Sequence, residues 1–267
     1  MFLRTSSALA IVISAFAAPA MAQDSKVADL YDALAMSDII DIMRAEGVDY
    51  GAQIGTDLFP NRVNGAWIAT VSDIYDAQAM HTHVRSAFEA SLEGDDVDAM
   101  LDFFTTAPGR DMVALEVSAR RALLDDAVDA ASKEAAKLAE ADNTARFQML
   151  QEFVEVNDLI ETNVVGALNS NYAFYTGLMN GGAFDGALTE DQILSDVWDQ
   201  EDDIRTSTSE WVYSFLLLAY DPVSDDDLAA YTAFSRSDAG EALNATLFES
   251  FDEMFNDISF ALGSEAA

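Results

Sequence analysis

One short stretch occurs twice in this chain, and it limits the possible folds more than any other feature. The first copy spans residues 97–115 and the second spans residues 228–246. When Gly109 is aligned with Gly240, the apolar residues of the two copies coincide, and they recur at the spacing of one face of a helix. Each copy therefore predicts a helical corner, in which a short amphipathic helix leads through a turn into a second helix.

Three positions define this motif, namely an aromatic residue, a hydroxyl residue and a glycine. They are Phe103, Thr106 and Gly109 in the first copy and Phe234, Ser237 and Gly240 in the second. The hydroxyl is predicted to cap the second helix, because a side-chain oxygen satisfies an amide left unpaired at a helix N-terminus. A glycine inside a helix costs roughly 1 kcal/mol relative to alanine. Its repetition predicts the close approach of another helix, so all six residues are interpreted as structural.

The N-terminal residues have the parts of a secretory signal peptide. Arg4 precedes an apolar run over residues 9–18, and Ala20 and Ala22 occupy the small-residue positions of a cleavage site. We therefore predict a signal peptide over residues 1–22, cleaved after Ala22, and a periplasmic or secreted protein. No later apolar run is long enough to span a bilayer, so no integral membrane segment is expected after cleavage.

The pattern of a Phe, a Ser or Thr and a Gly in a helical pair, behind a secretory signal, resembles the bacterial family called domain of unknown function 2059. The resemblance is strongest over residues 228–255 and looser over residues 97–117, where Pro108 stands in place of Ala239. It implies an all-helical extracytoplasmic protein. No established activity accompanies this family, so the resemblance implies no catalytic residue.

Weaker matches between distant parts of the chain indicate an internal duplication. Trp67 and Trp198 are separated by the same offset as the two aligned glycines. Residues 23–140 and residues 144–262 are therefore predicted to form two similar helical halves, the second of which carries the clearer family-like motif. The expected fold is all-α, a helical bundle built from these two similar halves.

The first predicted half contains three glycines at every fourth position, Gly47, Gly51 and Gly55. Asp49 lies among them and argues against a pair of membrane helices. A loose helix or a close-packed crossing of two soluble helices is expected instead. After this segment, an apolar stripe with a period of about 3.6 residues predicts one amphipathic helix over residues 66–92.

Acidic residues dominate the charge of the chain. It carries 48 acidic and 13 basic residues, a formal net charge of −35, and it has no cysteine. The charge makes nucleic acid and anionic lipid poor partners, and it leaves cations, basic proteins or a salty habitat open. We interpret most of the carboxylates as a solvated surface. The lack of cysteine excludes disulfides and thiolate metal sites.

No pattern in the sequence predicts a catalytic, cofactor-binding or metal-binding residue. His81 and His83 lie two residues apart on a predicted helix, so they point in different directions and do not form a metal-chelating pair. The glycine-rich loop at residues 181–186 lacks the lysine of a phosphate-binding loop. An enzyme would need one of the histidines to meet a carboxylate and a nucleophile in the folded protein.

Two functions other than catalysis fit the sequence. The favoured one is a periplasmic protein-interaction module that meets an unknown protein partner through an apolar or acidic face. The alternative is a carrier of a small apolar ligand between the two halves, which the aromatic residues Tyr172, Phe174 and Tyr175 beside Gly177 suggest. A connected apolar cavity would favour the carrier, and a filled core with an exposed apolar patch would favour the module.

Overall fold

The computed structural model describes residues 17–58, 65–92, 97–184 and 188–267, with side chains from Ser25 onward. Each regular element in these residues is an α-helix, which confirms the all-α prediction. The helices before residue 123 are α1 (Ala17–Ala33), α2 (Met36–Leu58), α3 (Gly65–Ile74), α4 (Ala77–Ser91), α5 (Asp98–Phe104) and α6 (Gly109–Ala122). The later helices are α7 (Asp126–Ala141), α8 (Ala145–Val156), α9 (Leu159–Gly181), α10 (Glu190–Trp198), α11 (Glu201–Tyr220), α12 (Asp225–Ser235) and α13 (Asp238–Ala266). The predicted signal peptide, residues 1–22, lies outside the residues whose side chains are described.

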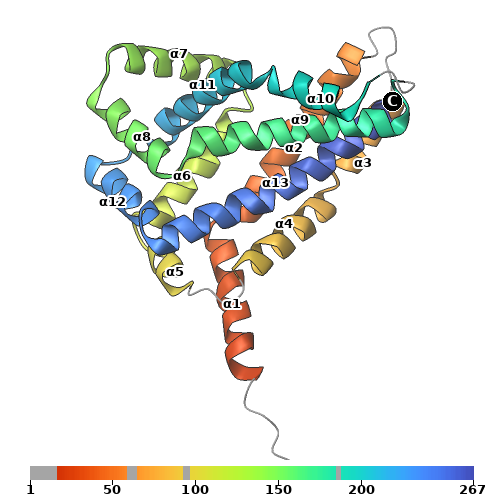
Figure 1. The fold of residues 1–267 in the computed structure, drawn as a ribbon. Helices are drawn as coiled ribbons and strands as arrows, with labels where there is room; N and C mark the ends of the chain where they lie inside the picture. Colours follow the sequence, from red (N-terminus) through yellow and green to blue (C-terminus); the bar gives the residue numbers. More distant parts are fainter. Residues whose placement is uncertain (1–16, 59–64, 93–96, 185–187) are drawn as a thin grey trace, which may run out of the picture.

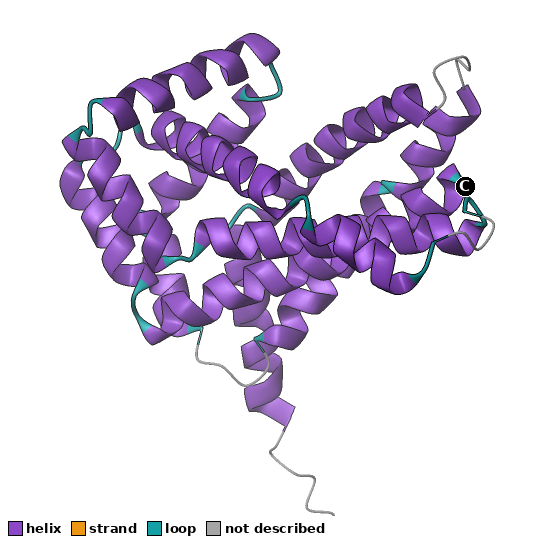
Figure 2. Ribbon diagram, turned by 45° about the horizontal axis from the view of Figure 1, so that its top comes forward, coloured by secondary structure: helices purple, strands orange, loops and turns teal. Residues whose placement is uncertain are grey.

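Two long helices, α9 and α13, run side by side through the middle of the molecule (Figure 1). Their backbones approach closely where Gly177 faces Gly263, because a Cβ on either residue would overlap a backbone carbonyl of the other helix. α4 packs against α13, while α10 and α11 pack against α9. The second view shows the described elements as helices joined by loops and turns (Figure 2). α9 and α13 therefore form the centre of the molecule, and one or the other is contacted by α2, α3, α4, α5, α8, α10, α11 and α12.

The buried core combines helices from both predicted halves of the chain. The largest cluster of buried apolar side chains includes Phe88 of α4 and Leu262 of α13. A second cluster joins Met112 of α6 to Leu216 of α11. The two predicted halves thus share their cores instead of each enclosing its own, and the internal duplication remains a prediction.

The glycines of α2 form a close-packed helix crossing, one of the two outcomes that the sequence predicts. Gly47, Gly51 and Gly55 are buried on one face of α2, and α3 lies against that face. A Cβ on Gly51 would come within 2.5 Å of a methyl carbon of Val71. The indole nitrogen of Trp67 donates a hydrogen bond of 2.7 Å to the carbonyl oxygen of Gly51. Because these glycines have no side chains, the bulky residues of α3 can pack directly against the backbone of α2.

Replacing Gly51 with valine is expected to lower the free energy of unfolding by about 2 kcal/mol, because the new methyl groups would overpack the contact with Val71. The matched control is Gln53→Val, which places the same side chain at an exposed position of the same helix. Urea denaturation of both variants gives the comparison. Equal stabilities of the two variants would show that the contact is not tightly packed.

The prediction of one continuous helix over residues 66–92 is wrong, because the helix is interrupted between α3 and α4. Asp76 stands at the break, and its side chain accepts a hydrogen bond of 2.8 Å from the amide of Ala79. A capping carboxylate satisfies an amide at the start of α4 and so favours a new helix there. The apolar stripe continues across the break, which is why periodicity alone does not reveal it.

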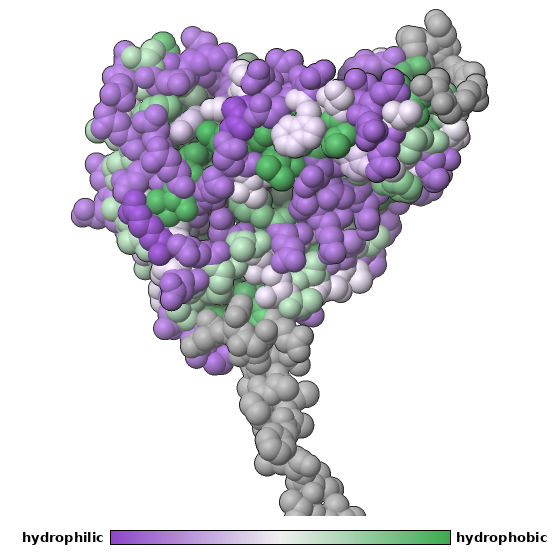
Figure 3. Space-filling model, viewed as in Figure 1, coloured by the Kyte–Doolittle hydropathy of each residue, from purple (hydrophilic) through white to green (hydrophobic). Residues whose placement is uncertain are grey.

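The surface of the described residues is mostly hydrophilic, with apolar side chains in small patches on the face shown in Figure 3. Carboxylates far outnumber cations, 48 to 13, so ion pairs cannot neutralise most of them. Within the described residues, no helix combines the length and the apolar character needed to cross a membrane.

Moderate salt is expected to raise the melting temperature by several degrees, because counterions screen the repulsion among the surface carboxylates. Thermal unfolding followed by circular dichroism at low and moderate sodium chloride concentrations measures this effect. A flat response would indicate that the carboxylates are too widely spaced to repel one another appreciably.

Candidate ligand-binding cavity

The two copies of the repeated motif form two similar corners, α5 with α6 and α12 with α13, and their aromatic residues meet. The rings of Phe103 and Phe234 stack with centroids 4.3 Å apart and planes inclined by 11°. A Cβ on Gly109 would overlap the carbonyl oxygen of Phe103, and a Cβ on Gly240 would overlap that of Phe234. In each corner, the glycine thus lets the second helix begin directly against the end of the first.

The hydroxyl residues of the motif differ between the two corners. Ser237 caps α13, since its Oγ accepts a hydrogen bond of 3.1 Å from the amide of Gly240. The predicted cap by Thr106 is wrong: its hydroxyl donates to the carbonyl of Asp102, at 2.7 Å, and α6 has no side-chain cap. Ser237 directly precedes its helix, whereas Thr106 lies too early because Pro108 is the residue that precedes α6.

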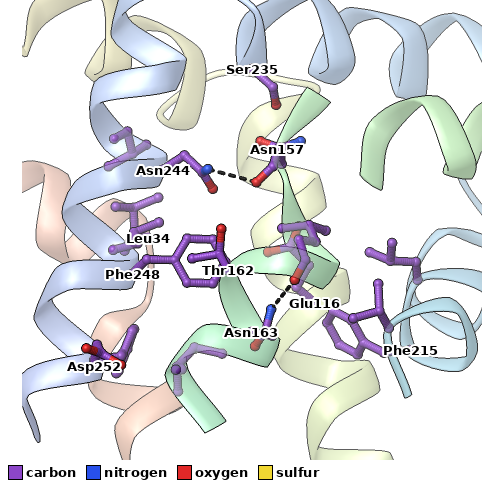
Figure 4. Close-up of a pocket in the computed structure, with 18 of the residues that line it drawn as sticks. Leu34, Glu116, Asn157, Thr162, Asn163, Phe215, Ser235, Asn244, Phe248 and Asp252 are labelled. Atoms are coloured by element: carbon purple, nitrogen blue, oxygen red, sulfur yellow. Dashed lines mark hydrogen bonds between the residues drawn. The ribbon is translucent and has the colours of Figure 1, made fainter. Parts of the chain in front are cut away.

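A cavity of about 830 Å³ lies between the corners and the long helices. Its walls come chiefly from α2, α6, α9, α11 and α13, with α5, α8 and α12 closing one part. Most of the lining side chains are apolar, and they include Met43, Val113, Phe215, Leu247 and Phe248. Figure 4 shows Phe248 and Phe215 on opposite sides of the cavity. Residues of both predicted halves line it, so the cavity lies where the carrier hypothesis places a ligand.

The aromatic residues that suggested a carrier are not the ones that form the cavity. Phe174 and Tyr175 pack against the largest buried cluster, and the hydroxyl of Tyr172 donates to Glu190 at 2.7 Å. As is usual for aromatic residues at helical spacing, they pack against buried clusters, and they do not border the cavity. They lie further along α9 than the segment that lines the cavity, which ends at Ser170.

Glu116 lines the cavity and has a shifted proton equilibrium, and it was not among the site residues expected from the sequence. The hydroxyl of Tyr220 donates to its carboxylate at 2.5 Å. The sequence did contain a pattern that indicates this position, because Glu116 lies four residues after Met112 and three after Val113, both of which are buried. On a helix this spacing places the carboxylate on the buried face.

The environment of Glu116 brings its proton equilibrium close to neutral pH. Burial raises the pKa of Glu116 to about 7, and hydrogen bonds from Tyr220 and Tyr231 oppose the rise. Burial also raises the pKa of both tyrosines well above their ordinary value, so both hydroxyls stay protonated. The cavity therefore contains one carboxyl group that changes charge near pH 7 and two hydroxyl groups beside it.

The two histidines lie outside the cavity lining. His81 is 3.1 Å from a carboxylate oxygen of Asp41, and His83 lies 3.7 Å from Glu253 and 3.8 Å from Asp257. The described residues contain no cluster of three or more side chains suited to hold a metal ion. Neither histidine is therefore placed to act on a molecule in the cavity.

Fold and cavity define the chain as an all-helical protein with a mainly apolar cavity. Residues 78–137 match the sequence model of a family described as an uncharacterized protein conserved in bacteria (DUF2059), which confirms the resemblance. The matched segment runs from α4 into α7 and contains Phe103 and Gly109 of the first corner. The second corner, where we expected the stronger resemblance, lies outside the matched residues. No curated protein and no solved structure matches the chain.

Proposed function

We propose that the protein binds and carries a small, mainly apolar molecule in the cavity between α2, α6, α9, α11 and α13. The observation behind this proposal is a connected space of about 830 Å³ with a mainly apolar lining. Small-molecule sites are concave, measure roughly 300–1,000 Å³ and combine apolar walls with a few polar groups. Glu116, together with Tyr220 and Tyr231, supplies such polar groups in an otherwise apolar site.

The proposed carrier acts outside the cytoplasm. The features of a signal peptide over residues 1–22 support this location. An apolar molecule in an aqueous compartment loses its contact with water when it enters such a cavity, and the free energy gained scales with the apolar area removed from water. This gain would drive binding without any covalent step.

Native mass spectrometry of the protein, purified gently from its own cells, tests the proposal directly. A carrier is expected to appear with an added mass in the range of a small molecule, and that mass should disappear after partial unfolding. A bare chain, together with no binding of apolar probes, would contradict the proposal.

Replacing Thr162 with tryptophan is expected to reduce the binding of Nile red, a neutral apolar dye, by about tenfold or more, because the indole would fill part of the cavity. Thr162 lies on α9 and lines the cavity (Figure 4). The matched control is Thr206→Trp on α11, where the threonine is exposed. Dye fluorescence titrations measure both affinities, and equal losses or no loss in both variants would place the dye elsewhere.

A protein-interaction module is the second candidate function. Leu194 and Trp198 lie one turn apart on α10, and 46% and 56% of their surfaces are exposed. An exposed apolar pair of this kind suits a protein contact. Crosslinking in intact cells, followed by mass spectrometry, should then find a partner that is lost from the variant Trp198→Ser. A wild-type chain that crosslinks to no protein would contradict this second candidate.

A further inference from the structure

Three asparagines in the cavity lining have amide oxygens that can accept a hydrogen bond from a ligand. The side-chain amides of Asn157, Asn163 and Asn244 each donate to a backbone carbonyl, at 2.9, 2.6 and 3.0 Å respectively. Figure 4 shows the side chains of Asn157 and Asn244 near each other, with Asn244 bonded to the backbone of Asn157. Each amide nitrogen thus uses one of its two hydrogens, and the amide oxygens receive no hydrogen bond from the described part of the chain. A ligand that complements these oxygens has to donate hydrogen bonds.

The charges around the cavity are also unbalanced. Three acidic residues line it, Glu116, Glu249 and Asp252, and one carboxylate oxygen of Asp252 is buried without a hydrogen-bond donor. Among the described lining residues, the only cation is Arg120. Its guanidinium is already engaged with the carboxylate of Glu46 through two bonds of 3.1 and 2.7 Å. The cavity therefore presents a negative field to a ligand, with no unengaged cation to offset it.

We infer that the ligand of this cavity is an amine, an apolar body with a positively charged, hydrogen-bond-donating head group, and that carboxylates of equal size bind poorly. This inference rests on the proposed carrier function. An ammonium group would donate to the amide oxygens and pair with Glu116 or Asp252. A carboxylate head would meet like charges and no unengaged cation among the described lining residues, which carries the cost of leaving a charge unpaired.

The surroundings of Glu116 predict how such binding depends on pH. The carboxyl group faces Tyr220 of α11 and Tyr231 of α12, and Arg120 lies one turn further along α6, where it pairs with Glu46 of α2. An ammonium group beside Glu116 stabilises the ionised carboxylate. Because the pKa of Glu116 is raised to about 7 in the free protein, protonation competes with the amine, and the affinity should fall as the pH decreases below neutral.

Competition with Nile red by two eight-carbon compounds of opposite charge tests the inference. Octylamine and octanoate have the same number of carbon atoms and carry opposite charges at about pH 8. Octylamine is expected to displace the dye at a concentration at least about tenfold lower than octanoate does, because one charge interaction in a partly buried site is of that size. Moderate salt in the buffer suppresses unspecific attraction of the amine to the acidic surface.

Glu116→Gln is expected to reduce the advantage of octylamine over octanoate severalfold and to remove its pH dependence, both measured as a ratio of the two displacement concentrations within the same variant. The matched control is Glu155→Gln, which removes one charge from an exposed position outside the cavity lining. Equal displacement by the two compounds in the wild-type protein, or stronger displacement by octanoate, would overturn the amine inference while the carrier function stands. No binding of Nile red at all would overturn the carrier function and this inference with it.

Discussion

Glu116→Gln is expected to make the protein more stable than the wild type above neutral pH and nearly equal to it in mild acid. The folded state holds the pKa of Glu116 at about 7, whereas the ordinary value is 4.5. Between these two values, the folded protein binds a proton that the unfolded chain has released, so the stability falls as the pH rises. Each pKa unit corresponds to about 1.4 kcal/mol, which gives a loss of about 3 kcal/mol once the carboxyl is ionised in both states. Because glutamine cannot ionise, the variant Glu116→Gln keeps this part of its free energy of unfolding.

Urea denaturation of both proteins at several pH values between about 4 and about 8 measures the effect. The difference in free energy of unfolding between the variant and the wild type reports the contribution of Glu116 alone. The many surface carboxylates are the same in both proteins and cancel. The control Glu155→Gln removes an exposed charge and should show no comparable dependence on pH. Stability curves of wild type and Glu116→Gln that stay parallel over the whole range would contradict the burial of an ionisable Glu116.

Gly240→Leu is expected to lower the free energy of unfolding by about 3 kcal/mol or more, the upper part of the range for overpacked sites. A side chain at this position would overlap the backbone of Phe234, which cannot move aside as a flexible side chain could. Even Gly240→Ala should destabilise the protein. This sign is the opposite of the gain of about 1 kcal/mol that alanine brings over glycine at an unhindered helix position.

Ala245→Leu is the matched control, because Ala245 is exposed on the same helix and should accept leucine with a change within about 0.5 kcal/mol. Thermal and urea unfolding of the three variants provide the comparison. An unchanged melting temperature for Gly240→Leu would remove the steric explanation of the motif. Gly109→Leu should behave like Gly240→Leu, since Gly109 approaches the carbonyl of Phe103 in the same manner.

Features that depend on local patterns were predictable from the sequence. The all-α class follows from helical spacing of apolar residues, and the family resemblance follows from the spacing of Phe, Ser or Thr and Gly. The close crossing at Gly51 could be expected because small residues at every fourth position line one face of a helix. The periodicity of apolar residues gave a wrong helix boundary near Asp76. The apolar stripe continues past this residue, but its side chain caps a new helix there.

The cavity depends on contacts between residues that are far apart in the chain. A carrier was the alternative expected between the two halves, but the aromatic residues that suggested it, such as Phe174, pack against the core and do not line the cavity. Glu116 was passed over because a single acidic residue on a helix is ordinary in so acidic a chain. Its significance arises only where Tyr220 and Tyr231, more than a hundred residues later, close around it.

The sequence by itself determined the helical class, the two corners and the glycines at which helices begin or cross. These properties depend on steric and hydrogen-bonding preferences of neighbouring residues, which periodicity and spacing record. Only the tertiary structure decided that the two predicted halves share their cores, that a cavity remains between α9, α11 and α13, and that a carboxyl group lies within it. The packing of distant helices sets both the volume of a cavity and the pKa of a buried acid, and no local pattern contains that information.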